Sequence, residues 1–376
     1  MCRFVIIHFS TVHSRADTRI RIKQVASLAG AFEERVALYV QDGKGDERDE
    51  ARGIEVVDTG SRSGGRVTRM TKGAWRMYHA VRRARPSVAH FHDPELIPVG
   101  MLLKLSGIKV VYDVHEDVPR QILGKHWISP WLRRPVAALV EAVEWIAARV
   151  YDGMVTATPT ISARFPAKKT VTVQNFPILG ELVLPESKPF SERPPHVAYV
   201  GGITAARGGK EMVQALERVT NEEVRLQVGG TFTPTALESE VSGLPGWSRV
   251  VAHGWVDRST VATLLGNVRA GLVLFHPAPN HMDAQPNKMF EYMAAGLPVI
   301  ASDFPRWRKI IDGAGCGLLV DPLDPQAIAD AIEWILEHPE EAETMGRRGR
   351  EAVESTYNWE RESEALVDFY KQLLVK

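Results

Sequence analysis

Two carboxylates and a lysine lie close together in the second half of the chain and could hold a ligand that carries both negative charge and hydroxyl groups. After Asp283, the pair Pro286-Asn287 predicts a loop that ends at a helix N-cap, and Lys288 follows in the first helical turn. A cation there opposes the helix dipole, so Lys288 indicates that an anion is held. Glu291 lies about one turn further on. Its carboxylate and that of Asp283 can accept hydrogen bonds from sugar or ribose hydroxyls, although Glu291 could instead be an ordinary exposed helix residue.

A glycine-rich turn, Gly201-Gly202 followed by Arg207-Gly208-Gly209-Lys210, stands between a predicted strand and a predicted helix. Glycines at such a turn let backbone N–H groups approach a phosphate, and the helix N-terminus favours the anion. Arg207 and Lys210 add positive charge. A purely structural turn is the alternative interpretation.

Histidines and carboxylates follow two predicted strands in the first half of the chain. They form the groups His90-Phe-His92-Asp93 and His115-Glu116-Asp117. Ligand sites form at the carboxyl ends of strands in open α/β sheets. Such residues can bind a metal, but their spacing matches no zinc pattern. We therefore expect hydrogen bonds to a sugar or phosphate and no metal, with a structural role as the alternative for each single histidine.

The elements that must position these residues alternate between strands and helices, which favours parallel sheets with helices on both faces. In the first half, strands are predicted at residues 2–9, 36–40, 56–57, 88–91, 110–114 and 154–157, and helices at 17–32, 67–84 and 131–150. In the second half, strands are predicted at 196–200, 224–228, 249–253, 272–275, 299–302 and 318–320. The helices there are predicted at 210–219, 234–241, 258–268 and 288–295, with a further helix starting at Asp324-Pro325.

A proline-rich segment interrupts this alternation and has the composition of a linker. We therefore expect an N-terminal domain at 1–183, a linker at 184–195 and a C-terminal domain at 196–357. The fold class is α/β, with two doubly wound Rossmann-like domains that face each other across a cleft. In such folds the ligand lies in the cleft.

Length and composition indicate a globular protein of more than one domain. The chain has 376 residues, of which 44% are hydrophobic and 24% charged, and this excludes disordered, collagen-like and coiled-coil classes. Two cysteines, Cys2 and Cys316, are too few for a disulfide framework and fit a reducing cytoplasm. The apolar run from Phe4 to Phe9 is too short for a signal peptide, and no run is long enough to span a membrane.

The charges are unevenly distributed although the formal net charge is zero. Residues 1–185 hold 27 Lys+Arg and 19 Asp+Glu, and the remainder holds 19 and 27. No acidic residue lies between Asp58 and Asp93, where the cations are Arg62, Arg66, Arg69, Lys72, Arg76, Arg82, Arg83 and Arg85. Such a stripe attracts phosphates of nucleic acid or of an anionic membrane, or it is a solvated helix face. Nucleic acid is disfavoured because only Trp75 and Tyr78 could stack on bases.

Taken together, these motifs resemble the family-4 glycosyltransferases, which have the GT-B fold, over nearly the whole chain. The spacing of Asp283 and Glu291, followed by Gly296-Leu-Pro298-Val299, is similar to the family's pair of acidic residues. The glycine turn with Arg207-Gly208 also resembles the family. Three further segments resemble the exopolysaccharide-type branch of the family. They are Asp17-Thr-Arg19-Ile20, the group from His90 to Asp93, and Tyr112-Asp113-Val-His115-Glu116. The segments Tyr357-Asn-Trp359 and Phe369-Tyr370 resemble the family's last helix, which crosses back to the N-terminal domain, here at 358–376.

The resemblance implies roles for individual residues of the C-terminal domain. Glu291 would accept the ribose hydroxyls of the donor, and Arg207 with Lys288 would bind its diphosphate. Gly201, Gly202 and the first helical amides after Asn287 would contribute to the same site. Asp283 stands where the family usually has Glu and would contact the transferred sugar, while Gly202 stands where many members have Arg.

In the N-terminal domain, the resemblance places His115 near the transferred sugar. It places Asp17, Arg19, His92 and Glu116 on the acceptor side. The first loop, Ser10–Asp17, lacks the family's usual paired glycines.

The implied activity is transfer of a sugar from a nucleotide-diphosphate sugar to a glycan, a lipid-linked or a small-molecule acceptor. UDP is the expected nucleotide, and GDP is the alternative. The family retains anomeric configuration by front-face displacement and needs no metal or other cofactor. We expect a cytoplasmic enzyme, peripheral on the inner face of an anionic membrane through Arg62–Arg85. The alternatives are a sugar-nucleotide epimerase and a non-catalytic sugar-nucleotide binding protein.

Overall fold

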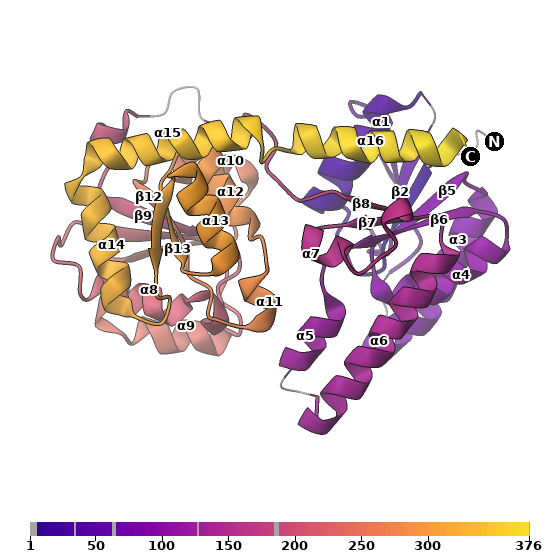
Figure 1. Ribbon diagram of the computed structural model, residues 1–376, viewed down its shortest axis with the longest axis horizontal. Helices are drawn as coiled ribbons and strands as arrows, with labels where there is room; N and C mark the ends of the chain where they lie inside the picture. Colours follow the sequence, from indigo (N-terminus) through magenta and orange to yellow (C-terminus); the bar gives the residue numbers. More distant parts are fainter. Residues whose placement is uncertain (1–5, 34, 62–64, 126–127, 184–187, 376) are drawn as a thin grey trace. The chain divides into compact units, whose positions relative to one another are not determined.

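The protein consists of two compact α/β units. The computed structural model describes residues 6–33, 35–61, 65–125, 128–183 and 188–375. One unit, the N-terminal domain, comprises Met1–Asn175 with Glu360–Lys376, and the other, the C-terminal domain, comprises Phe176–Trp359 (Figure 1). Each domain has its own sheet and its own hydrophobic core.

An eight-stranded sheet in the order β3-β4-β2-β1-β5-β6-β7-β8 forms the centre of the N-terminal domain. Its described strand pairs are parallel, except that β3 runs antiparallel to β4. The strands are β1 (Ile6–Phe9), β2 (Val36–Val40), β3 (Glu47–Asp49), β4 (Ile54–Asp58), β5 (Val88–Phe91), β6 (Lys109–Val114), β7 (Gly153–Thr156) and β8 (Thr170–Thr172). The strand order reverses direction between β1 and β5, so the carboxyl ends of these two strands mark the topological switch point.

Helices cover both faces of this sheet. They are η1 (Thr18–Val25), α1 (Ala26–Ala31), α2 (Arg66–Thr68), η2 (Arg69–Gly73), α3 (Ala74–Ala84), η3 (Pro94–Leu96), α4 (Ile97–Leu105), α5 (Val118–Gly124), α6 (Pro130–Val150), α7 (Pro159–Ser162), η4 (Ala167–Lys169) and the C-terminal α16 (Trp359–Val375). Alternate strand residues, such as Phe9 and Phe91, pack in one core with α3, α4 and residues at the end of α6. The other alternate residues include His90, which contacts Tyr370 of α16.

The C-terminal domain contains a six-stranded parallel sheet in the order β11-β10-β9-β12-β13-β14. Its strands are β9 (His196–Val200), β10 (Arg225–Gly229), β11 (Val250–Gly254), β12 (Ala270–Val273), β13 (Val299–Ser302) and β14 (Gly317–Val320). Its helices are η5 (Phe190–Glu192), η6 (Ala205–Arg207), α8 (Gly209–Leu216), α9 (Thr235–Ser242), η7 (Pro245–Arg249), α10 (Arg258–Leu265), α11 (Pro279–Met282), α12 (Asn287–Ala294), α13 (Pro305–Ala314), α14 (Pro325–Glu337) and α15 (Pro339–Ser355). The switch point lies between β9 and β12.

The C-terminal domain includes residues that precede its first strand. Phe176 is buried against Phe290 and Tyr357, which is why the compact unit begins ahead of the predicted linker. Within that linker, residues 184–187 lie outside the described residues. Phe190 beyond them is buried in a core of the C-terminal domain, so this part of the segment is packed.

The predicted fold class is confirmed in that two Rossmann-like α/β domains are present, each with a largely or wholly parallel sheet. One strand pair, β3 with β4, departs from the parallel arrangement. Across the described part of the chain, no helix combines the length and the apolar character that a membrane span requires.

Candidate functional site

The glycine turn of the C-terminal domain lies at the switch point of its sheet. Gly201 directly follows β9 and has a φ of 109°, a left-handed conformation that favours glycine. Its amide donates to the Gly229 carbonyl oxygen at 2.8 Å. A Cβ on Gly230 would lie 2.0 Å from the Gly201 carbonyl oxygen, so the two loops approach each other too closely for a side chain there. The turn therefore leaves backbone exposed where α/β sheets bind ligands.

Arg207 and Lys288 meet at this turn. Lys288 Nζ lies near Gly201, since a Cβ built on that glycine would be 3.6 Å from it. A Cβ on Gly202 would likewise lie 3.5 Å from Arg207 Nη1, which donates to the Gly202 carbonyl oxygen at 3.1 Å. The structure thus brings these two cations to the same turn. Lys210 takes no part, because it pairs with Glu240 at 2.7 Å.

Lys288 is a buried cation with no hydrogen-bond partner among the described residues. Only 8% of the residue is exposed, and Nζ lies 3.4 Å from the centroid of the Tyr199 ring. Burial, and then the charge of Arg207, holds the pKa of Lys288 well below its ordinary value, while Glu291 opposes that shift. An isolated buried charge is costly, and a bound anion would remove most of that cost.

Glu291 is held by an arginine that the sequence did not single out. Arg258 at the start of α10 donates from Nη1 to Glu291 Oε1 at 2.7 Å. Its other side-chain donors bind both carboxylate oxygens of Glu181, at 3.0 and 2.7 Å. This ion pair restrains the side chain of Glu291. The neighbours Phe290 and Tyr292 are buried in the core of the domain.

The loop before α12 places the remaining donor-side residues. Pro286 occupies the N-cap position and Asn287 is the first helical residue, with an exposed side chain. Asp283 is exposed at the C-cap of α11. The indole of Trp307 donates to the Ala284 carbonyl oxygen at 2.8 Å and ties this loop to α13.

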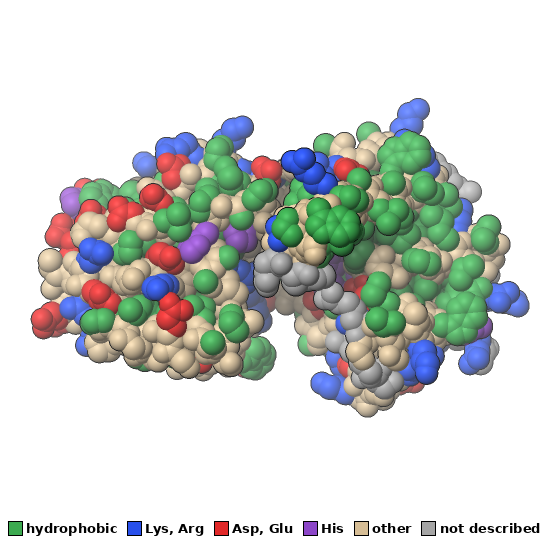
Figure 2. Space-filling model, turned by 90° about the horizontal axis from the view of Figure 1, so that it is seen from below, with side chains coloured by type: hydrophobic (Ala, Val, Ile, Leu, Met, Phe, Trp, Pro, Cys, Tyr) green, Lys and Arg blue, Asp and Glu red, His purple; other side chains and the backbone are tan. Residues whose placement is uncertain are grey.

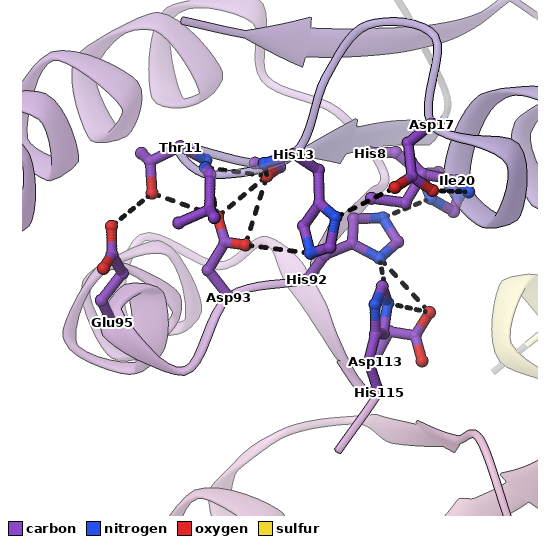
Figure 3. Close-up of polar contacts among 12 residues, drawn as sticks. His8, Thr11, His13, Asp17, Ile20, His92, Asp93, Glu95, Asp113 and His115 are labelled. Carbon is purple, nitrogen blue, oxygen red and sulfur yellow. Dashed lines mark hydrogen bonds and ion pairs between the residues drawn. The ribbon is translucent and has the colours of Figure 1, made fainter. Parts of the chain in front are cut away.

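In the N-terminal domain, Asp113 is the centre of a buried polar network (Figure 3). Its carboxylate accepts from Arg19 Nη2 at 2.9 Å and from Gln24 Nε2 at 2.6 Å. It also lies 2.9 Å from His115 Nε2 and 3.3 Å from His92 Nδ1. Burial alone would raise the pKa of Asp113, but Arg19 and His115 hold it well below its ordinary range.

The network continues through a row of imidazoles into the domain. His92 Nε2 lies 3.0 Å from His8 Nδ1, and His90 Nδ1 lies 2.6 Å from the Tyr370 hydroxyl on α16. Parallel pairing of β1 with β5 sets His8 directly beside His90. Burial lowers the pKa of His92 to about 4, although Asp113 opposes that shift, so these rings are neutral near pH 7.

A second carboxylate, Asp93, organises the loop after β1. It accepts from the Thr11 amide at 2.6 Å and from Ser10 Oγ at 2.9 Å. His13, in the same loop, bonds Asp17 at 3.1 Å, and Asp17 caps η1 by accepting from the Ile20 amide at 2.9 Å. Burial alone would raise the pKa of Asp17, but the hydrogen bonds from His13 and the Ile20 amide lower it to about 2.

The structure therefore brings some predicted N-terminal residues together and separates others. His92 and His115 share one site, with the His115 side chain 14% exposed and those of His92 and Asp113 fully buried. Arg19 is buried as the charge partner of Asp113. Glu116 points elsewhere, because it is exposed and accepts from Gln121 at 2.7 Å.

Two groups of three side chains have ligand atoms close enough to hold a metal ion, namely His8 with His90 and His92, and His92 with Asp113 and His115. The rings of His90 and His92 stack with only 17° between their planes. The rings of His92 and His115 instead meet edge to face, with 63° between their planes. Hydrogen bonds link members of both groups, whereas His90 Nε2 has no hydrogen-bond partner among the described residues.

Comparisons with known proteins agree with this architecture. Residues 20–175 match the model for a glycosyl transferase 4-like domain, and residues 194–338 match the model for glycosyl transferases group 1. Glycogen synthase from Mycobacterium tuberculosis is 22% identical over 297 residues, which is 76% of this chain and 69% of that protein.

Two solved structures share the fold over almost the whole chain. Sucrose-phosphate synthase from Thermosynechococcus elongatus has a TM-score of 0.78 at 20% identity and covers 99% of this chain and 100% of its own. Anabaena HepE in complex with UDP-glucose has a TM-score of 0.73 at 12% identity, covering 98% and 99%. With a glycosyltransferase model matching each of its domains, the chain is an enzyme of the group 1 glycosyltransferase family and has the GT-B fold.

Proposed function

We propose that this enzyme transfers a sugar from a nucleotide-diphosphate sugar, with UDP the expected nucleotide, to a glycan, lipid-linked or small-molecule acceptor. We propose that the reaction retains anomeric configuration and requires no metal, as the resemblance to the family-4 glycosyltransferases implies. The observation that carries the proposal is the buried cation Lys288, which lacks a partner in the described chain and lies with Arg207 beside the glycine turn. The complex of the related fold with UDP-glucose supports the choice of nucleotide.

The chemistry of the leaving group explains why cations are needed there. As the bond between sugar and diphosphate breaks, negative charge grows on the diphosphate. Arg207, Lys288 and the N-terminus of α12 are fixed in advance and would stabilise that charge. Glu291, oriented by Arg258, would accept the ribose hydroxyls.

The N-terminal network would serve the acceptor side. Asp113 holds His115 through a 2.9 Å contact, and the partly exposed ring of His115 would hydrogen-bond the transferred sugar. In the proposed front-face path, the departing diphosphate accepts the proton of the acceptor hydroxyl. His92 and Arg19 would then position His115 and Asp113, and Asp283 would contact the sugar from the C-terminal domain.

Nucleotide binding tests the donor site. We expect UDP to raise the melting temperature more than UMP does, because only UDP carries the second phosphate. A ligand that binds only the native state at 100 times its Kd adds about 2.7 kcal/mol of stability. Arg207→Ala should remove the difference between UDP and UMP. Equal shifts with UDP and UMP in the unmodified enzyme would contradict the assignment of the phosphate site.

Product analysis tests the reaction. With UDP-sugars and a panel of acceptors, NMR of the anomeric proton should show a product of the donor's configuration, formed in the presence of a metal chelator. Inversion would refute the proposed retention. Conversion of the UDP-sugar into another UDP-sugar without an acceptor would identify an epimerase instead.

A further inference from the structure

Helix α6 buries small or charged residues and exposes large apolar ones. The residues that it buries are Ala137, Glu144, Ala147 and Ala148. In contrast, Trp131 is 75% exposed and Leu139 64% exposed. This is the reverse of the usual pattern, in which the apolar face of a surface helix packs on the core.

The exposed apolar residues form one continuous stripe along the helix. It consists of Trp131, Pro135, Leu139, Val143, Ile146 and Val150, which we call the α6 stripe. Successive members are three or four positions apart, so they lie on one side of the helix. Two neighbouring helices that contact α6 expose further apolar residues, Leu123 on α5 and Leu102 and Leu105 on α4. Figure 2 shows hydrophobic side chains gathered over the surface of this domain.

The charges around the α6 stripe are mainly positive. Arg134 and Arg149 are exposed on the helix itself, and Arg149 stacks on exposed Trp145 with its guanidinium carbon 3.2 Å from the ring centroid. Glu144 is buried and paired with Arg164 at 2.5 Å, which leaves Glu141 as the exposed acid of the helix.

The same balance extends over the surrounding helices. Residues 67–150 contain 13 Lys+Arg and 7 Asp+Glu. Three of those acids, Asp93, Asp113 and Glu144, are buried and contribute little to the surface. Part of the predicted basic stripe adds to this positive charge. Helix α3 packs against α4 and exposes Arg76, Arg82 and Arg83. Arg62 lies outside the described residues.

We propose that the α6 stripe docks this enzyme on the surface of an anionic lipid bilayer. Aliphatic side chains flanked by tryptophan and arginine match the interface between acyl chains and phosphate headgroups. The acidic headgroups complement the excess of cations. A second copy of this chain would instead bring like charges together. The proposal extends the proposed function, because a transferase held there would meet a lipid-linked acceptor.

Vesicle flotation of the full chain tests docking. We expect the enzyme to float with vesicles of phosphatidylcholine and phosphatidylglycerol, and to float much less with phosphatidylcholine alone or in high salt. The double variant Leu139→Glu with Ile146→Glu should reduce the vesicle-bound fraction about tenfold. The matched control, Leu323→Glu with Val375→Glu, changes two exposed apolar residues outside α6 and should float like the unmodified chain.

Two further measurements keep this test separate from that of the proposed function. The shift of the melting temperature by UDP should be the same in the α6 variant as in the unmodified chain, which shows that the variant is folded and the donor site intact. Sedimentation equilibrium should show the same mass for both. Flotation that is unaffected by the α6 variant, no flotation of the unmodified chain, or a dimer that the α6 variant dissociates would each overturn the proposal.

Discussion

Replacing Lys288 by methionine should make the ligand-free enzyme more stable and at the same time remove its ability to bind a diphosphate. Methionine fills a similar volume without the charge, and its sulfur would lie over the Tyr199 ring where Nζ now lies 3.4 Å from the centroid. Because Lys288 Nζ has no hydrogen-bond partner among the described residues, the substitution breaks no ion pair there.

The size of each effect follows from the burial of this residue. Exchanging buried charge for packed apolar atoms is often neutral or stabilising by about 1–4 kcal/mol. In a domain the size of Phe176–Trp359, about 1 kcal/mol corresponds to roughly 2–4 °C in Tm. Loss of one preorganised group that stabilises developing charge lowers turnover by roughly 100-fold or more. We therefore expect the Lys288→Met enzyme to melt at a higher temperature than the unmodified enzyme and to be nearly inactive.

The pH dependence of the free energy of unfolding provides a further check of this prediction. The native state depresses the pKa of Lys288, so the unfolded chain binds the additional proton in the interval below its ordinary pKa of 10.5. Stability of the unmodified enzyme therefore rises with pH through that interval. The advantage of Lys288→Met should narrow as the pH approaches 10.5.

Thermal melts of Lys288→Met with and without UDP, at several pH values, measure all three effects. Lys210→Met is the matched control, because Lys210 lies in the same motif but is exposed and pairs with Glu240. This control should change the ligand-free Tm by no more than about one degree. It should leave the Tm shift caused by UDP unchanged. The reasoning is refuted if Lys288→Met melts below the unmodified enzyme and still responds fully to UDP.

Three more predictions concern charged side chains and their partners. Arg258→Met should raise the donor KM about tenfold or more with a smaller change in kcat, because Glu291 loses its ion-pair partner. Arg258→Lys should recover part of the lost donor affinity. An unchanged KM would show that Glu291 does not depend on Arg258. Asp113→Asn should lower the free energy of unfolding by about 3–5 kcal/mol in urea titrations, because Arg19 stays buried without its partner; a loss below 1 kcal/mol would argue against this pairing. Asp17→Ala should lose about 1 kcal/mol of η1 capping near neutral pH. That deficit should shrink as the pH falls from 3.8 towards 2, where Asp17 takes up its proton, and a deficit independent of pH would contradict the lowered pKa.

Sequence patterns predicted most of the sheet because its strands are rich in β-branched residues and end at clear turns. The bounds of β2, β5, β9 and β13 are the predicted ones. Helix α4 was missed because its sequence, IPVGMLLKL, is apolar with little periodicity. The edge strands β3 and β8 were missed because each is only three residues long, which is too short for a periodic pattern to be recognised.

The site was predictable where a residue follows a strand and hidden where it lies inside one. His92, His115 and Gly201 directly follow strands, so topology alone drew attention to them. Asp113 lies within β6, and a single polar residue in a buried strand reveals its partners only once the neighbouring elements are in register. Arg258 was hidden for a related reason: it meets Glu291 through the packing of α10 near α12, and no local pattern records that contact.

The two domains place opposite chemistry at equivalent points of their sheets. Near the switch point of the N-terminal domain lie two buried carboxylates, Asp113 and Asp93, with imidazoles beside them. Beyond that of the C-terminal domain lie Arg207 and the buried charge of Lys288. A diphosphate would be repelled by the first set and held by the second, whereas a sugar hydroxyl needs acceptors and finds them in the first. On this reasoning we propose that the C-terminal domain binds the nucleotide and that the N-terminal domain binds the hydroxyl groups of the acceptor.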